Sequence, residues 1–345
     1  MIKNKFILGI LLLIFGLSFS GKSQEIGSKE KSDRANEILS LAKQSVYGKS
    51  PKDKLKSLSL IIINNTREGQ NTIASKEVGA NESVKELDDK DNKDFGDSSE
   101  REISTEILFE FPNKIKWLST SQKLNSSIGT SINTSVSLNA EKYKNQITVS
   151  ANGKPFDTTK IPLLANLNLF GDSKKLTDAE IVKKRESFLD DFWLTIFPIL
   201  LETPWTSAAT FEYAGKAEAE GTKADIIDVK SLGTKKIQLF FDEKSHLLLM
   251  MTVKNEVEKD KSKVNEDYKY FYSNYENVDG ILVAKKITVE GNTKFVTDKS
   301  VMGYKIKGRN TESSSQIEIK GIKINPTFKA NTFLIADEKP ADKKK

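Results

Sequence analysis

Histidine and cysteine, the side chains that most often act as proton shuttles, nucleophiles and metal ligands, are almost missing from this sequence. The 345 residues contain one histidine, His246, and no cysteine. Thiolate nucleophiles, disulfides, zinc fingers and iron–sulfur clusters are therefore excluded, as is any site that needs two imidazoles. His246 follows a turn at Asp242–Ser245, and no G-x-S-x-G sequence offers it a serine nucleophile. We interpret His246 as a solvent-facing turn residue and predict that the chain is not an enzyme, although acid pairs for glycoside chemistry stay open because sequence does not show distance.

Two further patterns lack the context that their chemistry requires. Gly16–Ser23 matches the phosphate-binding pattern G-x-x-x-x-G-K-[ST], but residues 24–34 are almost wholly polar and offer no helix face to bury. Three acids crowd at Asp88, Asp89 and Asp91, without the central Gly and terminal Glu of a calcium loop. We expect no nucleotide site, no metal site and no cofactor.

The net charge of +6 lies at the two ends of the chain. Lys3, Lys5 and Lys22 contribute three positive charges within the first 23 residues, which hold no acid. Three more come from residues 343–345, inside a basic tail at 341–345, so the stretch between the ends is neutral. A neutral body has no electrostatic footprint for nucleic acid, and we expect no nucleic-acid partner.

The start of the sequence has the order of a secretory signal peptide: a basic segment, an apolar run over Phe6–Ser20, and small residues after it. At ~1.5 Å per residue this run is too short for the ~30 Å core of a bilayer. We predict a signal peptide at 1–23, with cleavage after Ser23 preferred to cleavage after Ser20; an uncleaved anchor is the alternative. Because no cysteine follows the run, lipid anchoring is excluded, and the expected location is the periplasm.

No Gly- or Pro-rich linker divides residues 24–340, so we predict a single domain there, and hydrophobic periodicity indicates that it is made mainly of strands. A helix is expected over Ser32–Tyr47 and a strand over Leu55–Asn64. Residues 66–102 show almost no apolar periodicity, and we expect a solvated, disordered acidic insertion between two strands there. From Ile103 to Phe111 alternate residues are apolar, which indicates a strand with one buried face.

A second helix is predicted from Thr177, where Thr177–Glu180 reads as a capping box. Apolar residues recur along it at a spacing of four in two adjacent rows, a stripe wider than a surface helix needs. Pro198 is expected to kink or break the helix because its ring removes a donor and clashes one turn back.

The remaining sequence, from Ser207 to Ile324, predicts successive hairpins. We expect turns at Asp242–Ser245, Asn277–Gly280 and Glu290–Asn292, and a bulge at Gly321, where the alternation changes phase. The strands expected around the later turns are 267–275, 281–290, 294–307 and 315–324. About a dozen antiparallel strands in one sheet must curl or close. The predicted fold class is therefore mainly β (α+β), a large curled antiparallel sheet forming a half-open barrel, with helices covering its concave face.

Three short segments carry a resemblance to a known family. They are Phe111–Trp117 (FPNKIKW), Val278–Ile287 (VDGILVAKKI) and Ile322–Phe328 (IKINPTF). In these segments and in its order of elements, the sequence resembles the LolA-like periplasmic lipoprotein carriers over roughly residues 32–337. The resemblance implies a half-barrel that shields acyl chains, with inner- and outer-membrane sorting proteins as partners.

The sequence also departs from that family pattern. The carriers have an Arg just before the Pro-Asn turn that helps to latch a helical lid, and Phe111 stands there instead. The chain is longer than a minimal carrier, and the acidic segment 66–102 has no counterpart. Without that Arg, the latch cannot work here as it does in the family.

Two hypotheses for function follow. The first is a carrier or chaperone that binds acyl chains of lipoproteins or lipids in a hydrophobic cavity; the second is a non-transporting envelope interaction module whose core is filled by its own side chains. We expect a monomer in either case. The residues predicted to line the cavity are Phe109, Phe111, Trp117, Phe188, Phe192, Trp193, Ile196, Phe197, Leu239, Phe241 and Leu249.

Overall fold

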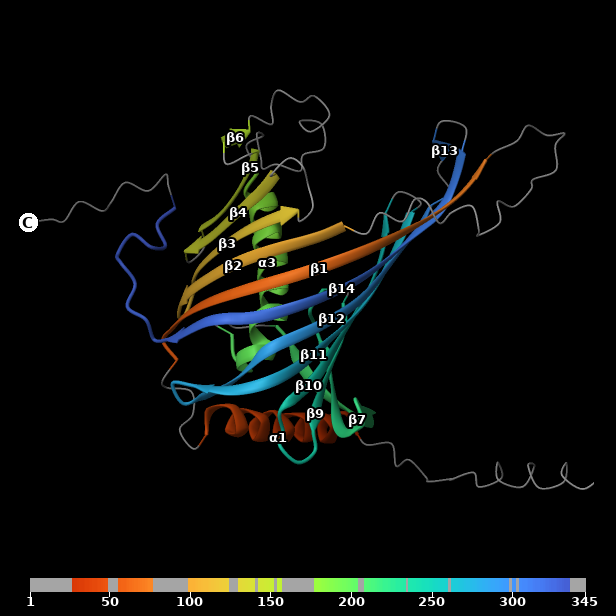
Figure 1. Ribbon diagram of the computed structural model, residues 1–345. Coiled ribbons are helices and arrows are strands. Elements are labelled where there is room, and N and C mark those ends of the chain that lie inside the picture. The colour runs from red at the N-terminus through yellow and green to blue at the C-terminus, as the bar shows by residue number, and fades with distance from the viewer. Residues whose placement is uncertain are drawn as a thin grey trace, which may run out of the picture.

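One curled antiparallel sheet dominates the computed structural model (Figure 1). The structure describes residues 27–48, 55–76, 99–123, 130–139, 142–151, 154–156, 177–203, 208–233, 235–259, 262–297, 300–301 and 304–335. The predicted signal peptide at 1–23, most of the predicted acidic insertion and the basic tail at 341–345 lie outside these residues.

The sheet contains 14 strands within the described residues, in the order β6-β5-β4-β3-β2-β1-β14-β12-β11-β10-β9-β8-β7, with β13 beside β14. Each pair is antiparallel, and the two end strands are not joined to each other, so the fold is a half-open barrel. The strands are β1 Ser57–Lys76, β2 Ser99–Glu110, β3 Lys114–Lys123, β4 Thr130–Asn139, β5 Lys142–Ala151, β6 Lys154–Phe156, β7 Thr210–Ala219, β8 Thr222–Lys230, β9 Lys236–Asp242, β10 Leu248–Lys259, β11 Ser262–Val278, β12 Ile281–Thr297, β13 Ser300–Val301 and β14 Tyr304–Ile324.

Two long helices accompany the sheet. Helix α1 (Ser28–Tyr47) lies at its lower end in Figure 1, and helix α3 (Asp178–Leu200) crosses its concave face behind β1 to β5. The predicted capping box at the start of α3 is present: the Glu180 N–H donates to Thr177 Oγ1, and the Thr177 N–H donates to a Glu180 carboxylate oxygen. Pro198 lies inside α3, which ends two residues later with Leu201 in the left-handed conformation.

The core lies between the concave face and the helices. Alternation along β2 is as predicted, because Thr105, Ile107 and Phe109 point into the core and are buried. From α1 the buried residues are Ala35, Ile38, Leu39, Ala42, Val46 and Tyr47. The two helices therefore complete a core that the unclosed sheet leaves incomplete.

The strands around the acidic segment are longer than the sequence predicts. β1 extends to Lys76 and β2 begins at Ser99, and their pairing reaches into the range 66–102, with Thr66 opposite Arg101. The expected solvated insertion is therefore wrong at both of its ends, while residues 77–98 lie outside the described part. Strand segments with few apolar residues give no periodic signal in the sequence.

Gly291 is not in a turn, contrary to the prediction. β12 runs unbroken from Ile281 to Thr297, and Gly291 pairs with Tyr268 of β11. A Cβ atom at Gly291 would lie 2.3 Å from Cε1 of Tyr268, so glycine is required for the tyrosine ring to lie over the strand. The strand expected over 294–307 is accordingly divided between β12, β13 and β14.

The bulge predicted at Gly321 is present, because the register between β1 and β14 shifts between Ile61 and Ile62, opposite Gly321 and Ile319. The predicted turn before Ile281 is present as well. Asp279 and Gly280 both adopt positive φ, and Asn277 Oδ1 accepts a hydrogen bond from the Gly280 N–H.

Candidate functional site

An aromatic cluster joins the first half of α3 to the concave face of the sheet. Phe192 packs edge-on against Phe109 of β2 and Trp117 of β3, with ring centroids 6.3 and 5.8 Å apart. One turn earlier on α3, Phe188 stacks on Phe192 at 5.7 Å and contacts Tyr143 of β5 at 6.0 Å. The spacing of four places both phenylalanines on the helix face that meets the sheet.

The second half of α3 fills the centre of the curled sheet. Trp193 and Phe197 stack with their centroids 4.4 Å apart, and Phe197 stacks in turn on Phe211 of β7 at 5.6 Å. Trp193 is 1% exposed, and the following residues from Ile196 to Leu201 are buried without interruption. This half of the helix is part of the protein core.

Burial is lower toward the N-terminus of α3. On the helix face that meets the sheet, Phe192 is 1% exposed, whereas Phe188 and Ile181 are half-buried. On the sheet, Trp117 and Tyr143 are half-buried as well. The aromatic cluster therefore reaches the surface beside the N-terminal half of α3, whereas its other end is sealed.

Polar contacts hold the sealed end of α3 in place. The Tyr47 hydroxyl at the end of α1 donates to the Leu200 carbonyl oxygen, and Lys43 forms an ion pair with Glu202 at 3.0 Å. Burial raises the pKa of Tyr47 well above its ordinary value, which keeps this hydroxyl a donor. These contacts join the C-terminal ends of the two helices.

Ten of the eleven predicted site residues meet in one core. Seven are buried in it, and the other three, Phe111, Trp117 and Phe188, are half-buried against it. The seven are Phe109, Phe192, Trp193, Ile196, Phe197, Leu239 and Phe241. These ten residues form a filled core along most of α3, and their role in binding a ligand stays a prediction.

Leu249 is the exception, and its assignment to the cavity is wrong. The register of β10 against β9 shifts between Leu248 and Met250, so Leu249 is an extra residue and the strand changes face there. Leu248 and Met251 join the main core, whereas Leu249 and Met250 pack with Phe240 on the outer face of the sheet. Period-two alternation in the sequence cannot reveal such a bulge.

A row of tyrosines on β11 was not singled out from the sequence as part of the site. Tyr268 and Tyr270 are partly buried against the core and Tyr272 is buried in it, while the Tyr275 hydroxyl donates to the Leu248 carbonyl oxygen at 2.6 Å. Burial raises the pKa of Tyr270 to about 12. The alternation of tyrosines over 268–272 was the signal that could have found them.

Two titratable side chains stand out among the described residues, His246 and Asp225. His246 adopts a positive φ in the turn after β9 and borders a hollow of about 810 Å³ beside α1. Asp225 is the one buried carboxylate among the described residues, with 5% of its surface exposed. It accepts a hydrogen bond from the Tyr213 hydroxyl at 3.3 Å, and the guanidinium of Arg34 lies over the Tyr213 ring. Among the described residues no group of three His, Asp or Glu side chains could hold a metal ion.

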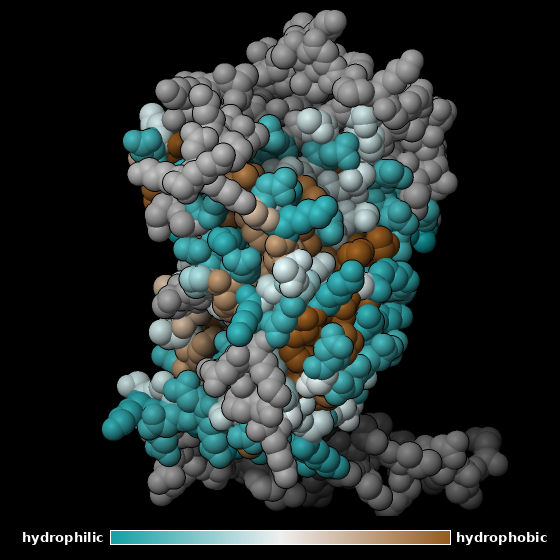
Figure 2. Space-filling model, turned by 90° about the vertical axis from the view of Figure 1, so that its left-hand side faces the viewer, coloured by the Kyte–Doolittle hydropathy of each residue, from teal (hydrophilic) through white to brown (hydrophobic). Residues whose placement is uncertain are grey.

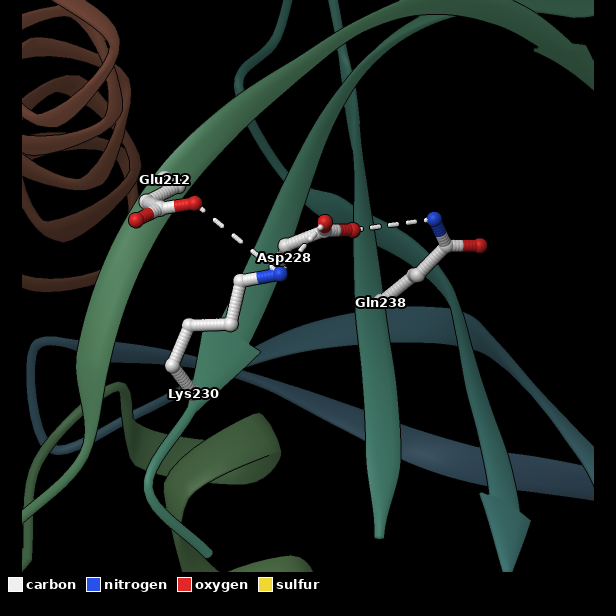
Figure 3. Close-up of polar contacts among 4 residues, drawn as sticks. All are labelled: Glu212, Asp228, Lys230 and Gln238. Atoms are coloured by element: carbon white, nitrogen blue, oxygen red, sulfur yellow. Dashed lines mark hydrogen bonds and ion pairs between the residues drawn. The ribbon is translucent and has the colours of Figure 1, made fainter. Parts of the chain in front are cut away.

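Away from the apolar cluster around Phe240, the outer face of β7 to β9 carries interacting polar side chains. On β7 to β9, Asp228 accepts hydrogen bonds from Gln238 (2.9 Å) and Lys230 (3.0 Å), and Lys230 lies 3.9 Å from Glu212 (Figure 3). Further along, a hollow of about 1030 Å³ crosses β9 to β12, β14 and β1 and has acidic and basic residues in its lining. Figure 2 shows apolar residues in brown between hydrophilic ones on the side it presents. An apolar ligand is therefore better accommodated on the concave face than on the outer face.

Neither helix is long and apolar enough, over the residues described, to cross a membrane.

No protein-family model matches the sequence, and neither does any curated protein. Among solved structures, the chain is similar to a LolA superfamily protein, NE2245 from Nitrosomonas europaea, with 9% identity, a TM-score of 0.37, and coverage of 88% of this chain and 98% of that one. It is also similar to a DUF1329 family protein from Desulfovibrio piger, with 9% identity, a TM-score of 0.34, and coverage of 89% and 98%. The Pseudomonas aeruginosa MucA/MucB complex matches with 8% identity, a TM-score of 0.16, and coverage of 85% of this chain and all of that one.

Proposed function

We propose that this chain is an exported, non-catalytic protein that binds acyl chains of lipoproteins or lipids on its concave face, beneath the N-terminal half of α3. The decrease in burial along the sheet-facing side of α3, from Phe192 to the half-buried Phe188 and Ile181, carries the proposal. It provides an apolar surface that is open at one end and bounded at the other by the anchored helix. Each methylene buried there contributes ~0.8 kcal/mol, so affinity needs no charged group.

The ligand would enter by displacing helical side chains. Phe188 contacts Tyr143 and Trp117, with ring centroids 6.0 and 6.4 Å apart, and moving it outward exposes both rings to an incoming chain. Contacts at the other end of α3, where Tyr47 and Lys43 hold Leu200 and Glu202, would stay in place. The helix would then act as a lid that is fixed at its C-terminal end.

One observation favours a second function. Phe192, Trp193 and Ile196 are almost fully buried and fill the centre of the sheet. A filled core suits an envelope interaction module that uses the same fold without carrying a ligand. The two functions differ in whether the first half of α3 moves aside for an acyl chain.

Export and partners belong to the same proposal. The predicted signal peptide at 1–23 supports a periplasmic protein, and the neutral body fits a partner other than nucleic acid. Its partners would be lipoprotein acyl chains or lipid, and the sorting proteins of the two membranes that supply and receive them, with no nucleic acid.

A cross-link across the lid tests the proposal. Because the chain has no cysteine, the variant Tyr143→Cys/Phe188→Cys has one thiol on β5 and one on α3, at positions whose rings now lie 6.0 Å apart. A short bismaleimide would join them, and the same variant capped with a monofunctional maleimide is the matched control. A fluorescent fatty acid should bind the capped protein at least about tenfold more tightly than the cross-linked one.

A second test of the proposal is native mass spectrometry of protein released gently from a periplasmic extract. Lipid adducts on the unmodified chain support the carrier. If neither lipid adducts nor binding of the fluorescent fatty acid is found, the carrier is wrong and the interaction module stands. Equal binding by the cross-linked and capped proteins would show that the ligand does not enter beneath α3.

A further inference from the structure

The hollow that crosses β9 to β12, β14 and β1 has a lining unlike that of the concave face. It has a volume of about 1030 Å³, and the described residues that line it are all polar except Gly291. Five of them are lysine or arginine and five are aspartate or glutamate, so their charges cancel at neutral pH. An acyl chain finds no apolar surface here, and a polyanion finds no net positive charge. This lining suits an uncharged ligand that forms hydrogen bonds.

Asn265 of β11, Lys294 of β12 and Asn310 of β14 form a row across the outer face of the sheet. Asn265 lies opposite Lys294, and Lys294 lies opposite Asn310. Tyr268 packs against the core and side chains alternate along a strand, so Asn265 points away from the core, as do the two residues in register with it. Asn265 and Lys294 line the hollow, and Asn310 continues the row on the next strand.

The two asparagines of this row have unsatisfied side chains. Oδ1 of Asn265 and Oδ1 of Asn310 are buried, and no donor in the described part of the chain bonds to either atom. Buried side-chain acceptors in folded proteins usually have a donor, and one without a donor calls for an explanation. Strands lie ~4.8 Å apart, so the two asparagines are roughly 10 Å apart with a lysine between them. The row therefore lacks two donors, on either side of an ammonium group that can donate.

A second row, two residues along the same strands, adds exposed polar groups. Asp267 lies opposite Asn292, which lies opposite Glu312, and all three are exposed. Asp267 forms an ion pair with Lys254 at 3.1 Å. These side chains offer carboxylate acceptors and an amide that both donates and accepts. The two rows together form a grid of donors and acceptors about 10 Å wide and ~7 Å long.

We propose that this hollow binds a free, uncharged oligosaccharide. A hydroxyl group donates one hydrogen bond and accepts others, so neighbouring sugar hydroxyls can donate to Oδ1 of Asn265 and of Asn310 and accept from the ammonium of Lys294. Lys294 is exposed and lies between the two asparagines, and on binding its side chain turns toward the sugar and uncovers them. Asn292 and Glu312 then bind hydroxyls of the same or the next sugar. The site lies on the opposite face from the proposed acyl-chain site and does not depend on it.

A peptide ligand fits this place less well. Peptides that bind a sheet commonly add a strand to one of its edges, where main-chain groups are free. β11 pairs with β10 and β12, β12 pairs with β11 and β14, and β14 pairs with β12 and β1. The three strands that carry the two rows are therefore interior strands, and recognition must use their side chains.

Isothermal titration calorimetry of the full mature chain with chitotetraose, cellotetraose and maltotetraose tests the proposal. At least one of these uncharged sugars should bind with a Kd below about 1 mM, and Asn265→Ala/Asn310→Ala should raise that Kd at least about tenfold. Asn133→Ala is the matched control and should leave the Kd unchanged, because Asn133 lies on β4 and its Oδ1 already accepts a hydrogen bond from the Thr120 hydroxyl at 2.8 Å. Binding of none of the three sugars, or an equal Kd for the double variant, would overturn the proposal.

Urea unfolding separates a role in binding from a role in the fold. The double variant should keep the unfolding midpoint of the unsubstituted chain or raise it, because it loses no hydrogen bond of the two Oδ1 atoms, whereas Asn133→Ala should lower the midpoint. If the double variant is destabilised as much as Asn133→Ala, the two asparagines serve the fold and the proposal is wrong. The double variant should also bind the fluorescent fatty acid as the unsubstituted chain does, so the failure of this proposal is distinguishable from the failure of acyl-chain binding.

Discussion

Two alanine substitutions one turn apart on α3 should differ several-fold in their effect on stability. Phe192 is 1% exposed and its ring contacts Phe109, Trp117 and Phe188, so Phe192→Ala removes a buried ring and leaves a cavity. Substitutions of this type cost about 3–5 kcal/mol. Phe188 lies on the same helix face but is half-buried. Full burial of such a side chain contributes ~2–3 kcal/mol, and Phe188 gains only about half of this, so Phe188→Ala should cost about 1–1.5 kcal/mol.

The measurement is urea unfolding of the full mature chain followed by circular dichroism, with the free energy of unfolding extrapolated to water. The helix propensity of alanine is the same at both positions, so the difference between the two variants reports burial alone. Equal losses of stability would show that the N-terminal half of α3 is as firmly packed as the rest of the helix. In that case α3 could not serve as a lid, and the reasoning from burial would fail.

Three further predictions concern the sheet. Gly291→Ala should destabilise the chain by about 1–3 kcal/mol, because the new Cβ would lie 2.3 Å from the ring of Tyr268; unchanged thermal unfolding would refute this. Phe111→Arg should also cost about 1–3 kcal/mol in urea unfolding, because it sets a charge in place of a ring that packs on Phe109 at 5.3 Å, whereas a position that serves as a latch would tolerate it. Burial raises the pKa of Tyr270 from its ordinary value near 10 to about 12, so the unfolded chain loses this proton first. Stability from this group should be complete below pH 10 and fall between pH 10 and pH 12; Tyr270→Phe should flatten that part of the curve, and an unchanged slope would contradict the assignment.

Local patterns in the sequence correctly predicted features that depend on a single helix turn or a single strand. The capping box at Thr177, the paired rows of α3 and the alternation of β2 from Ile103 to Phe109 all appear in the structure as predicted. In each case the signal and the structure depend on residues a few positions apart. The fold class followed because many such strands, joined by short turns, have few arrangements available.

The errors occurred where a distant strand decides the structure. Gly291 looks like a turn residue until Tyr268 of the neighbouring strand is placed over it. Leu249 looks like a core residue until its strand bulges against β9. Likewise, whether the concave face is open depends on how far α3 reaches across it. Pairings of this kind are set by the whole sheet and leave little trace in a single strand.

If an acyl chain displaces the first half of α3, the distance between that half and the sheet must change when the ligand binds. Spin labels at Val182→Cys on α3 and Gln122→Cys on β3, both exposed, would report the separation of helix and sheet by pulsed electron resonance in this cysteine-free chain. Adding a diacylated lipopeptide should lengthen this distance in a saturable manner. If the lipopeptide binds and the distance stays the same, the acyl chain does not displace α3.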